Sequence, residues 1–224
     1  MCPPEDPRPE DPRFVAARER MVAEQLSARG IHSGRVLAAM SSVPRQVFVA
    51  RQFWNEAYED HPVPIGEGQT ISQPYIVAAM LESLSVEPED RVLEVGTGTG
   101  YQAALLGHLA HSVVSIERQP QLAENARSNL ALLAYSNVEV ITGDGSLGYP
   151  PRAPYGRIIV AAASPALPRG LFEQLAEGGR MIVPVGNRDA QVLRLVRKIH
   201  GEPHVSDLEA CRFVPLLGES GFKL

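Results

Sequence analysis

From Arg91 onward, short apolar runs alternate with segments whose apolar residues recur at helical spacing. This alternation predicts an α/β fold with a doubly wound, mostly parallel sheet that carries helices on both faces. The polar segment 200–203 is assigned to no strand, and Gly178-Gly179 predicts a turn before the fifth strand. The predicted elements are strands at 91–95, 112–116, 137–141, 157–162 and 180–185, helices near 100–109, 120–132 and 168–176, and a closing antiparallel hairpin of 191–198 with about 210–216.

The N-terminal part of the chain predicts helices. Apolar residues recur at helical spacing from Phe14 to Arg29, from Ser33 to just before Pro44, from Arg45 to Trp54 and from Pro74 to Leu84. The segment from His61 to Pro74 is rich in proline and glycine and predicts a loop. Residues 1–12 are rich in proline and acidic residues, so we expect a disordered tail. We expect residues 13–224 to form one domain, with an N-terminal helical part at 13–84 and an α/β core at 85–224.

One stretch predicts a strand, a tight turn and the start of a helix: Val92-Leu93-Glu94-Val95-Gly96-Thr97-Gly98-Thr99-Gly100-Tyr101. Glycines at alternate positions let the backbone turn sharply and let a ligand approach without meeting a Cβ atom. The helix N-terminus then directs its free N–H groups at that ligand. In open α/β sheets this place is typical of a nucleotide-like cofactor. The alternative is a turn that serves only the packing of strand on helix.

The charges around this turn indicate which cofactor to expect. The glycine spacing is not the G-x-G-x-x-G of dinucleotide sites, because Tyr101 stands where the last glycine is required. A carboxylate at Glu94 would repel a pyrophosphate and attract a cation. S-adenosylmethionine fits, since it carries an ammonium and a sulfonium and no phosphate. Glu117 ends the next apolar run, at a spacing that suits hydrogen bonds to the two hydroxyls of a ribose.

Two further residues each have two interpretations. Ser72, two residues before Pro74, is interpreted as the N-cap of the helix that follows and as a hydroxyl held over the cofactor site; the two interpretations are compatible, and spacing alone favours the cap. Asp144, in the turn Gly143-Asp144-Gly145, either contacts an adenine edge or forms an Asx-turn without a ligand.

Composition narrows the function classes. The 224 residues are 44% hydrophobic, as in ordinary globular proteins, and the net charge of −5 gives no basic field for nucleic acid. No apolar run approaches the length of a membrane span, and no signal peptide is recognisable. The two cysteines, Cys2 and Cys211, indicate a reducing cytoplasm, and the scattered histidines predict no metal site. Neither a P-loop nor a G-x-S-x-G nucleophile motif is present.

From about Met21 to Leu217 the sequence resembles the protein-L-isoaspartate O-methyltransferases. The most specific segment is Thr70-Ile71-Ser72-Gln73-Pro74, which follows a Gly-x-Gly and precedes Tyr75-Ile76-Val77-Ala78. The glycine stretch from Leu93 to Tyr101 is similar to the family's cofactor motif. Other segments match in order, namely Glu117-Arg118, Gly143-Asp144-Gly145, Ala153-Pro154-Tyr155, Ala161-Ala162-Ala163, Gly178-Gly179-Arg180, Pro184-Val185-Gly186 and Phe213-Val214-Pro215-Leu216.

The resemblance implies a Rossmann-like methyltransferase fold and a role for each matching residue. Ser72 matches the family's active-site serine, the catalytic residue we expect here. Two departures are Gly156, where the family usually has Asp, and Ile159, which often has a His counterpart. The residues expected to bind the cofactor, from the resemblance and from the charge argument together, are Ile71, Gln73, Glu94, Gly96, Gly98, Gly100, Glu117, Asp144 and Gly145.

The resemblance also implies an activity, which is methyl transfer from S-adenosyl-L-methionine to the free α-carboxylate of L-isoaspartyl residues, with S-adenosyl-L-homocysteine as product. The expected partners are damaged proteins and peptides, and not nucleic acid or membrane. We expect a cytoplasmic monomer. Three rival hypotheses are a methyltransferase for another acceptor, an adaptor that binds the cofactor without catalysis, and, more distantly, an NAD-dependent oxidoreductase.

Overall fold

The computed structural model describes residues 11–223, and the tail expected at residues 1–10 lies outside this part. Asp11 and Pro12 belong to the first helix instead of the tail. Helix α1 (Pro12–Arg20) begins at Asp11, whose side chain accepts a hydrogen bond from the Arg13 backbone N–H. The helical path then continues through a π-helical segment (Met21–Leu26) and a 3-10 turn (Ser27–Arg29), and it ends at Gly30 with a φ of 94°. A continuous helical segment over 14–29 was therefore correctly predicted.

The rest of the N-terminal part is also largely helical. Helix α2 (Gly34–Ser42) begins at Ser33, whose hydroxyl accepts from the Val36 N–H. Two 3-10 turns, Arg45–Phe48 and Arg51–Glu56, take the place of the predicted third helical piece. Helix α3 (Pro74–Leu84) has the predicted boundaries.

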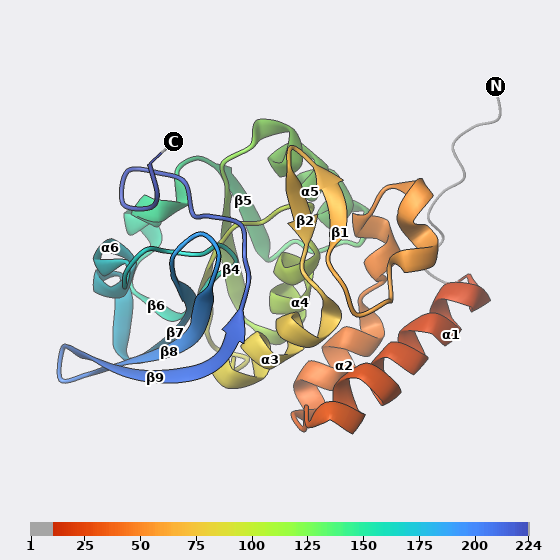
Figure 1. Cartoon of the computed structure of the whole chain (residues 1–224), viewed down its shortest axis with the longest axis horizontal. Coiled ribbons are helices and arrows are strands. Elements are labelled where there is room, and N and C mark those ends of the chain that lie inside the picture. The colour runs from red at the N-terminus through yellow and green to blue at the C-terminus, as the bar shows by residue number, and fades with distance from the viewer. Residues whose placement is uncertain (1–10, 224) are drawn as a thin grey trace.

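The prediction of a loop from 61 to 74 was wrong in part, because an antiparallel hairpin lies within it. Strand β1 (Val63–Gly66) pairs with β2 (Gln69–Ile71), and Val63 lies opposite Ile71. Gly66, Glu67 and Gly68 all have positive φ at its tip. These strands of three or four residues are too short to show an alternating pattern among the prolines and glycines. The hairpin stands apart from the main sheet beside α4 (Figure 1).

Within residues 11–223 seven strands form one sheet in the order β5-β4-β3-β6-β7-β8-β9. The pairs from β5 to β7 are parallel, and β8 and β9 add antiparallel to β7. The predicted fold class, a doubly wound and mostly parallel sheet with a closing antiparallel hairpin, is confirmed. The strands are β3 (Arg91–Val95), β4 (Ser112–Glu117), β5 (Val138–Thr142), β6 (Tyr155–Val160), β7 (Leu175–Gly186), β8 (Gln191–Ile199) and β9 (Glu202–Cys211).

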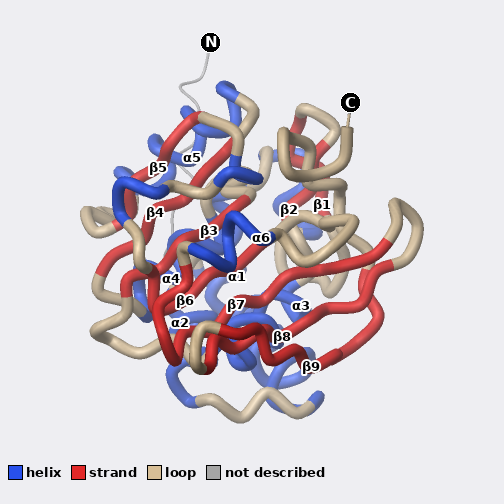
Figure 2. Tube along the Cα trace, turned by 90° about the vertical axis from the view of Figure 1, so that its left-hand side faces the viewer, coloured by secondary structure: helices blue, strands red, loops and turns tan. Residues whose placement is uncertain are grey.

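Helices cover both faces of this sheet, as Figure 2 shows with α6 (Arg169–Glu173) on the viewer's side and α1 to α3 behind. Helices α3, α4 (Tyr101–Leu109) and α5 (Pro120–Leu132) share one apolar cluster with alternate strand residues such as Val92 and Ile159. The intervening residues, Leu93 and Ile158 among them, face the second cluster with α6. This alternation buries the central strands on both faces. Among the described residues, no helix is both long and apolar enough to cross a membrane.

The closing hairpin pairs different residues from those predicted. Ile199 lies opposite Glu202, so the strands turn tightly at His200 and Gly201, which have φ of 53° and 78°. The partner strand is therefore 202–211 and not 210–216, and residues 202 and 203 belong to it. Strand β9 is an edge strand and mostly exposed, so it shows no apolar alternation from which to predict it. Gly178-Gly179 likewise lies inside β7, where the register with β6 shifts, and not before it.

Candidate active site

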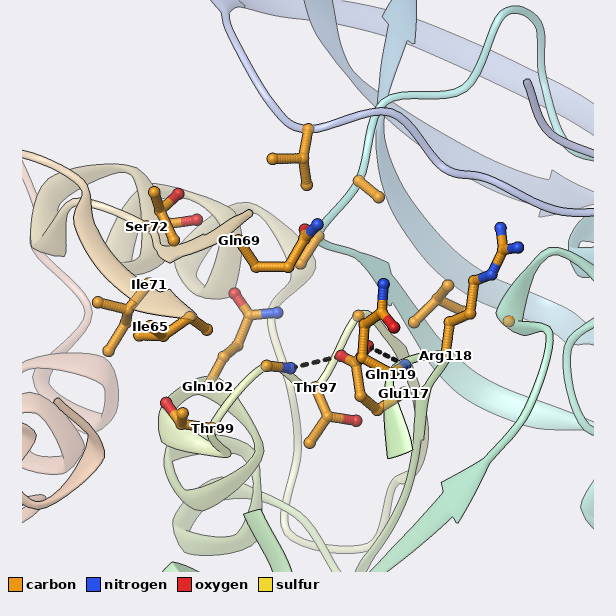
Figure 3. Close-up of a pocket in the computed structure, with 18 of the residues that line it drawn as sticks. Ile65, Gln69, Ile71, Ser72, Thr97, Thr99, Gln102, Glu117, Arg118 and Gln119 are labelled. Carbon is orange, nitrogen blue, oxygen red and sulfur yellow. Dashed lines mark hydrogen bonds between the residues drawn. The ribbon is translucent and has the colours of Figure 1, made fainter. Parts of the chain in front are cut away.

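A cavity opens where β3, β4 and β6 reach their carboxyl ends. Its lining combines the glycine turn after β3, the end of β4, the β1–β2 hairpin and a C-terminal segment, Val214–Leu217. Figure 3 shows Ser72, Ile71 and Ile65 on one side of this cavity and Glu117 with Gln119 on the opposite side. Segments far apart in the chain therefore meet at the sheet edge where ligands bind in open α/β folds.

The glycine turn has the backbone that its composition predicts. Gly96, Gly98 and Gly100 have φ of 94°, 58° and 100°, values that other residues rarely adopt. Gly96 and Gly98 line the cavity, and a Cβ on Gly98 would lie 3.0 Å from Ile65 Cδ1. Gly100 does not line it; it caps α4 and packs against Ala126 of α5, 3.3 Å from where its Cβ would be. The predicted site glycines therefore divide into two that a ligand can approach and one that serves packing.

Glu117 lies at the carboxyl end of β4 and lines the cavity. One carboxylate oxygen accepts from the Gly98 N–H at 2.8 Å and the other from the Gln119 N–H at 2.9 Å, the two bonds dashed in Figure 3. A carboxylate accepts about four hydrogen bonds, so both oxygens keep capacity for donors of a ligand. Two neighbouring hydroxyls, as in a ribose, match this remaining capacity.

Glu94 is fully buried and does not line the cavity. Burial raises its pKa to about 8, against a hydrogen bond from the Ser115 hydroxyl that lowers it. The carboxyl is therefore largely protonated at pH 7 in this structure and lacks the fixed negative charge assumed in the sequence argument. Its second oxygen lies beside the side-chain amide of Gln102, which donates toward it, lowers the pKa of Glu94 as Ser115 does, and lines the cavity. Of the two side chains, Gln102 is the one that a ligand in the cavity can contact, and Glu94 lies behind it.

Asp144 binds the C-terminal segment through its carboxylate and does not line the cavity. It accepts from the Ser146 N–H at 2.9 Å, from the Ser146 hydroxyl at 2.7 Å and from the Glu219 N–H at 2.8 Å. Burial raises the pKa of this carboxyl, but these hydrogen bonds outweigh it and the net shift is downward. The bond from the Ser146 N–H forms the expected Asx-turn, and contact of Asp144 with an adenine edge stays a prediction. Gly145, the next residue, does line the cavity, and a Cβ there would lie 2.6 Å from Val95 Cγ1.

The structure resolves the two interpretations of Ser72. The N-cap of α3 is Gln73, and the Tyr75 N–H is bound by the Asp60 carboxylate at 3.0 Å. The cap interpretation of Ser72 was therefore wrong, because a residue from the preceding segment supplies the acceptor. The Ser72 side chain forms no hydrogen bond with any other described residue, so its hydroxyl is available to a ligand.

Ser72 lies where the cavity meets a second, open groove. Both are lined by Ser72 and Thr70, and by Ala161, Val214 and Pro215 from the far side. Ile71 lines the cavity but not the groove, and Gln73 lines the groove but not the cavity. A hydroxyl at this junction can contact molecules in both spaces.

Sequence reasoning missed several lining residues. Gln69, Gln102, Gln119 and Leu216–Leu217 line the cavity. Gln102 was hidden in an apolar helix, where its polarity was the only signal. Leu216 and Leu217 carried no signal, since their position depends on a long-range contact in which Ala163 lies opposite Pro215.

The two departures from the family pattern, Gly156 and Ile159, lie in β6 and line neither the cavity nor the groove. A Cβ on Gly156 would lie 2.4 Å from Asp90 Oδ1, and Asp90 pairs with Arg157 at 3.4 Å. The glycine therefore accommodates this ion pair.

Comparisons with known proteins agree with this geometry. The profile of the protein-L-isoaspartate(D-aspartate) O-methyltransferase family matches residues 17–221. A protein-L-isoaspartate O-methyltransferase of Koribacter versatilis is 56% identical over 209 residues, 93% of this chain and 94% of the relative. One from Methanoculleus marisnigri is 54% identical over 206 residues, 92% and 94% of the two chains.

Two solved structures are also similar. One protein-L-isoaspartate O-methyltransferase superposes with a TM-score of 0.82 at 32% identity, covering 91% of this chain and 66% of the other. A Plasmodium falciparum chain described as the same kind of enzyme, in complex with S-adenosyl-L-homocysteine, gives 0.77 at 26% identity, covering 91% and 98%.

The buried Glu94 makes stability depend on pH. Its pKa of about 8 in the fold exceeds the ordinary value of 4.5, so between these values only the unfolded chain has released the proton. The free energy of unfolding should therefore fall as pH rises through this window, by at most about 1.4 kcal/mol per unit. We expect Glu94→Gln to lose less stability than the unmutated protein in urea denaturation between about pH 5 and pH 8. The exposed Glu19→Gln is the control, and a Glu94→Gln profile parallel to that of the unmutated protein would contradict the prediction.

Proposed function

The chain belongs to the protein-L-isoaspartate(D-aspartate) O-methyltransferase family, and we propose that it methylates the free α-carboxylate of L-isoaspartyl residues with S-adenosyl-L-methionine. The observation that carries this proposal is the position of Ser72 at the junction of the cavity beside the glycine turn and the open groove. Cofactor and peptide each have a space, and one free hydroxyl faces both.

The substrate arises when Asn or Asp cyclises to a succinimide that reopens to the wrong side. The main chain then runs through the β-carbon and leaves an α-carboxylate on a short branch. A methyl ester of this carboxylate can cyclise again, so methylation starts a repair. The open groove suits a branch presented on a peptide, whereas a small free acid would need an enclosed pocket.

The residues of the cavity fit the parts of S-adenosyl-L-methionine. Glu117 would accept from the ribose hydroxyls, and Gly96, Gly98 and Gly145 would let the adenosyl group approach the backbone. Gln102 would contact the amino-acid end from the cavity wall, with the buried Glu94 behind it. When bound, the cofactor supplies a methyl group on a positively charged sulfur.

The chain's own contribution is orientation and exclusion of water. A carboxylate has a pKa near 4 and is already an anion at pH 7, so no strong general base is required. Ser72 would donate its hydroxyl hydrogen to one carboxylate oxygen and direct the other at the methyl group. Alignment of this kind can supply much of the rate enhancement. Ile71 and Val214 would keep water from the two opposite charges before they react.

The groove contains both apolar and cationic side chains. Tyr75, Ile76 and Phe213 form its apolar part, and Arg29, Arg188 and Arg212 lie around it. This lining supports a peptide segment as acceptor. The oligomeric state and the compartment stay predictions, namely a monomer and the cytoplasm.

The first experiment is transfer of labelled methyl from S-adenosyl-L-methionine to a peptide that contains one isoaspartate. The same peptide with ordinary aspartate is the control. We expect base-labile label on the isoaspartyl peptide alone, because a methyl ester is hydrolysed by base. Label on neither peptide, with cofactor bound, would favour another acceptor or the adaptor hypothesis.

We expect Ser72→Ala to lower kcat by about 10- to 100-fold, because the carboxylate loses the donor that orients it. Affinity for S-adenosyl-L-homocysteine, measured by calorimetry, should stay within about twofold, since the hydroxyl does not hold the cofactor. Ser83→Ala on α3 is the matched control, because Ser83 lines neither the cavity nor the groove. Normal turnover in Ser72→Ala would remove this role.

Glu117→Gln tests the proposed ribose contact. The amide has one acceptor oxygen where the carboxylate has two, and the carboxylate already binds two backbone N–H groups. We expect the dissociation constant of S-adenosyl-L-homocysteine to rise by about 10-fold or more, as for a lost charge-assisted hydrogen bond. Glu124→Gln, on the exposed side of α5, is the control. Equal affinities in calorimetry would contradict the assignment.

A further inference from the structure

Arg45 is a completely buried arginine that forms no ion pair among residues 11–223, although the Asp60 carboxylate attracts it over a longer distance and raises its pKa. Its Nε donates to the Ala57 carbonyl at 2.6 Å, and its Nη2 donates to the Ser72 carbonyl at 2.6 Å. The guanidinium lies over the ring of Tyr101, 4.7 Å from its centre. The third nitrogen, Nη1, has no hydrogen-bond partner.

The stability of the fold alone does not explain why an arginine occupies position 45. Removing a guanidinium from water costs several kcal/mol, and two carbonyls with one aromatic ring replace only part of its hydration. An apolar side chain of similar volume would avoid this cost but would leave the Ala57 and Ser72 carbonyls without this donor. The unpaired Nη1 adds to the cost. The two carbonyl contacts are therefore the observation that requires an explanation.

These contacts connect the two halves of the active site. Ser72 lies between β2 and α3 on the substrate side, and Tyr101 begins α4 directly after the glycine turn on the cofactor side. The 3-10 turn that begins at Arg45 has a second bond to the glycine turn, since the Thr99 hydroxyl donates to the Phe48 carbonyl at 2.7 Å. The 3-10 turn Arg45–Phe48 therefore contacts both the Ser72 segment and the glycine turn.

The proposed function makes the backbone position of Ser72 important. Its side chain forms no hydrogen bond with another residue of 11–223, so the main chain sets the position of its Cβ and the hydroxyl rotates about it toward a ligand. Asp60 fixes the chain three residues further on, at the Tyr75 N–H. Arg45 binds the backbone carbonyl of Ser72 itself.

We propose that Arg45 is a positioning residue that fixes the Ser72 backbone relative to the cofactor turn and so aligns the acceptor carboxylate for methyl transfer. This inference rests on the proposed function. It also accounts for an arginine at this place, because a planar guanidinium reaches two carbonyls at a fixed separation while lying over the ring of Tyr101. A lysine ammonium is a single point and cannot reproduce this arrangement.

The test compares Arg45→Lys and Arg45→Met with the unmutated protein. The methionine variant removes the buried charge but leaves the Ala57 and Ser72 carbonyls without this donor, so urea denaturation is measured beside kcat to confirm that both variants are folded under the assay conditions. We expect kcat on an isoaspartyl peptide to fall by about 10- to 100-fold in both variants, as for a reacting group displaced by about 1 Å. Calorimetric affinity for S-adenosyl-L-homocysteine should stay within about twofold. Arg18→Lys is the matched control, since Arg18 is also a buried arginine but does not contact Ser72.

A double-mutant cycle separates positioning from a general structural effect. If Arg45 acts through Ser72, Arg45→Met should cost less than about twofold in kcat once Ser72 is Ala, because the oriented hydroxyl is already absent. A full loss in both backgrounds would overturn the proposal. So would unchanged kcat in either Arg45 variant, or loss of cofactor binding in both. Failure of the proposed function is recognised separately, since the unmutated protein would then methylate no isoaspartyl peptide.

Discussion

The parallel pairing of β3 with β4 on one side and β6 on the other is the constraint on which the site depends. Parallel strands end at the same edge, so the glycine turn, Glu117 and Ala161 meet there although they are distant in sequence. Because apolar side chains cover both faces of these strands, their register is strongly specified. The position of Glu117 next to the Gly98 N–H follows directly from that register.

Acidic side chains then connect this edge to the segments that close it. Glu117, Asp144 and Asp60 each accept hydrogen bonds from backbone N–H groups of other loops or helices. Asp144 thereby holds the C-terminal segment whose residues Val214–Leu217 line the cavity. Charge-assisted bonds of this kind are stronger than those between neutral groups, so a few of them define the walls of a site built largely from loops.

The sequence predicted the parts that depend on local pattern. The buried strands and the glycine turn could be predicted because continuous apolar runs and glycines are local signals. The hairpin β1–β2 and the edge strand β9 lack such signals, since one is too short and the other too exposed. Asp144 shows the same limit within the site, because its acceptor role depends on Glu219, which the sequence gives no means of placing beside it.

The Ser72 hydroxyl shows why the sequence can propose a site residue but cannot predict the contacts around it. Spacing alone favours Ser72 as a helix cap, and a capping hydroxyl would be occupied by a backbone N–H. Asp60 takes that task and Arg45 takes the Ser72 carbonyl, each from an earlier segment of the chain. Because of these long-range contacts, the Ser72 hydroxyl is not needed as a helix cap. Asp60 and Arg45 bind the backbone around Ser72 in place of its own side chain. The role proposed for the hydroxyl therefore depends on these two residues as well as on the position of Ser72 in the sequence.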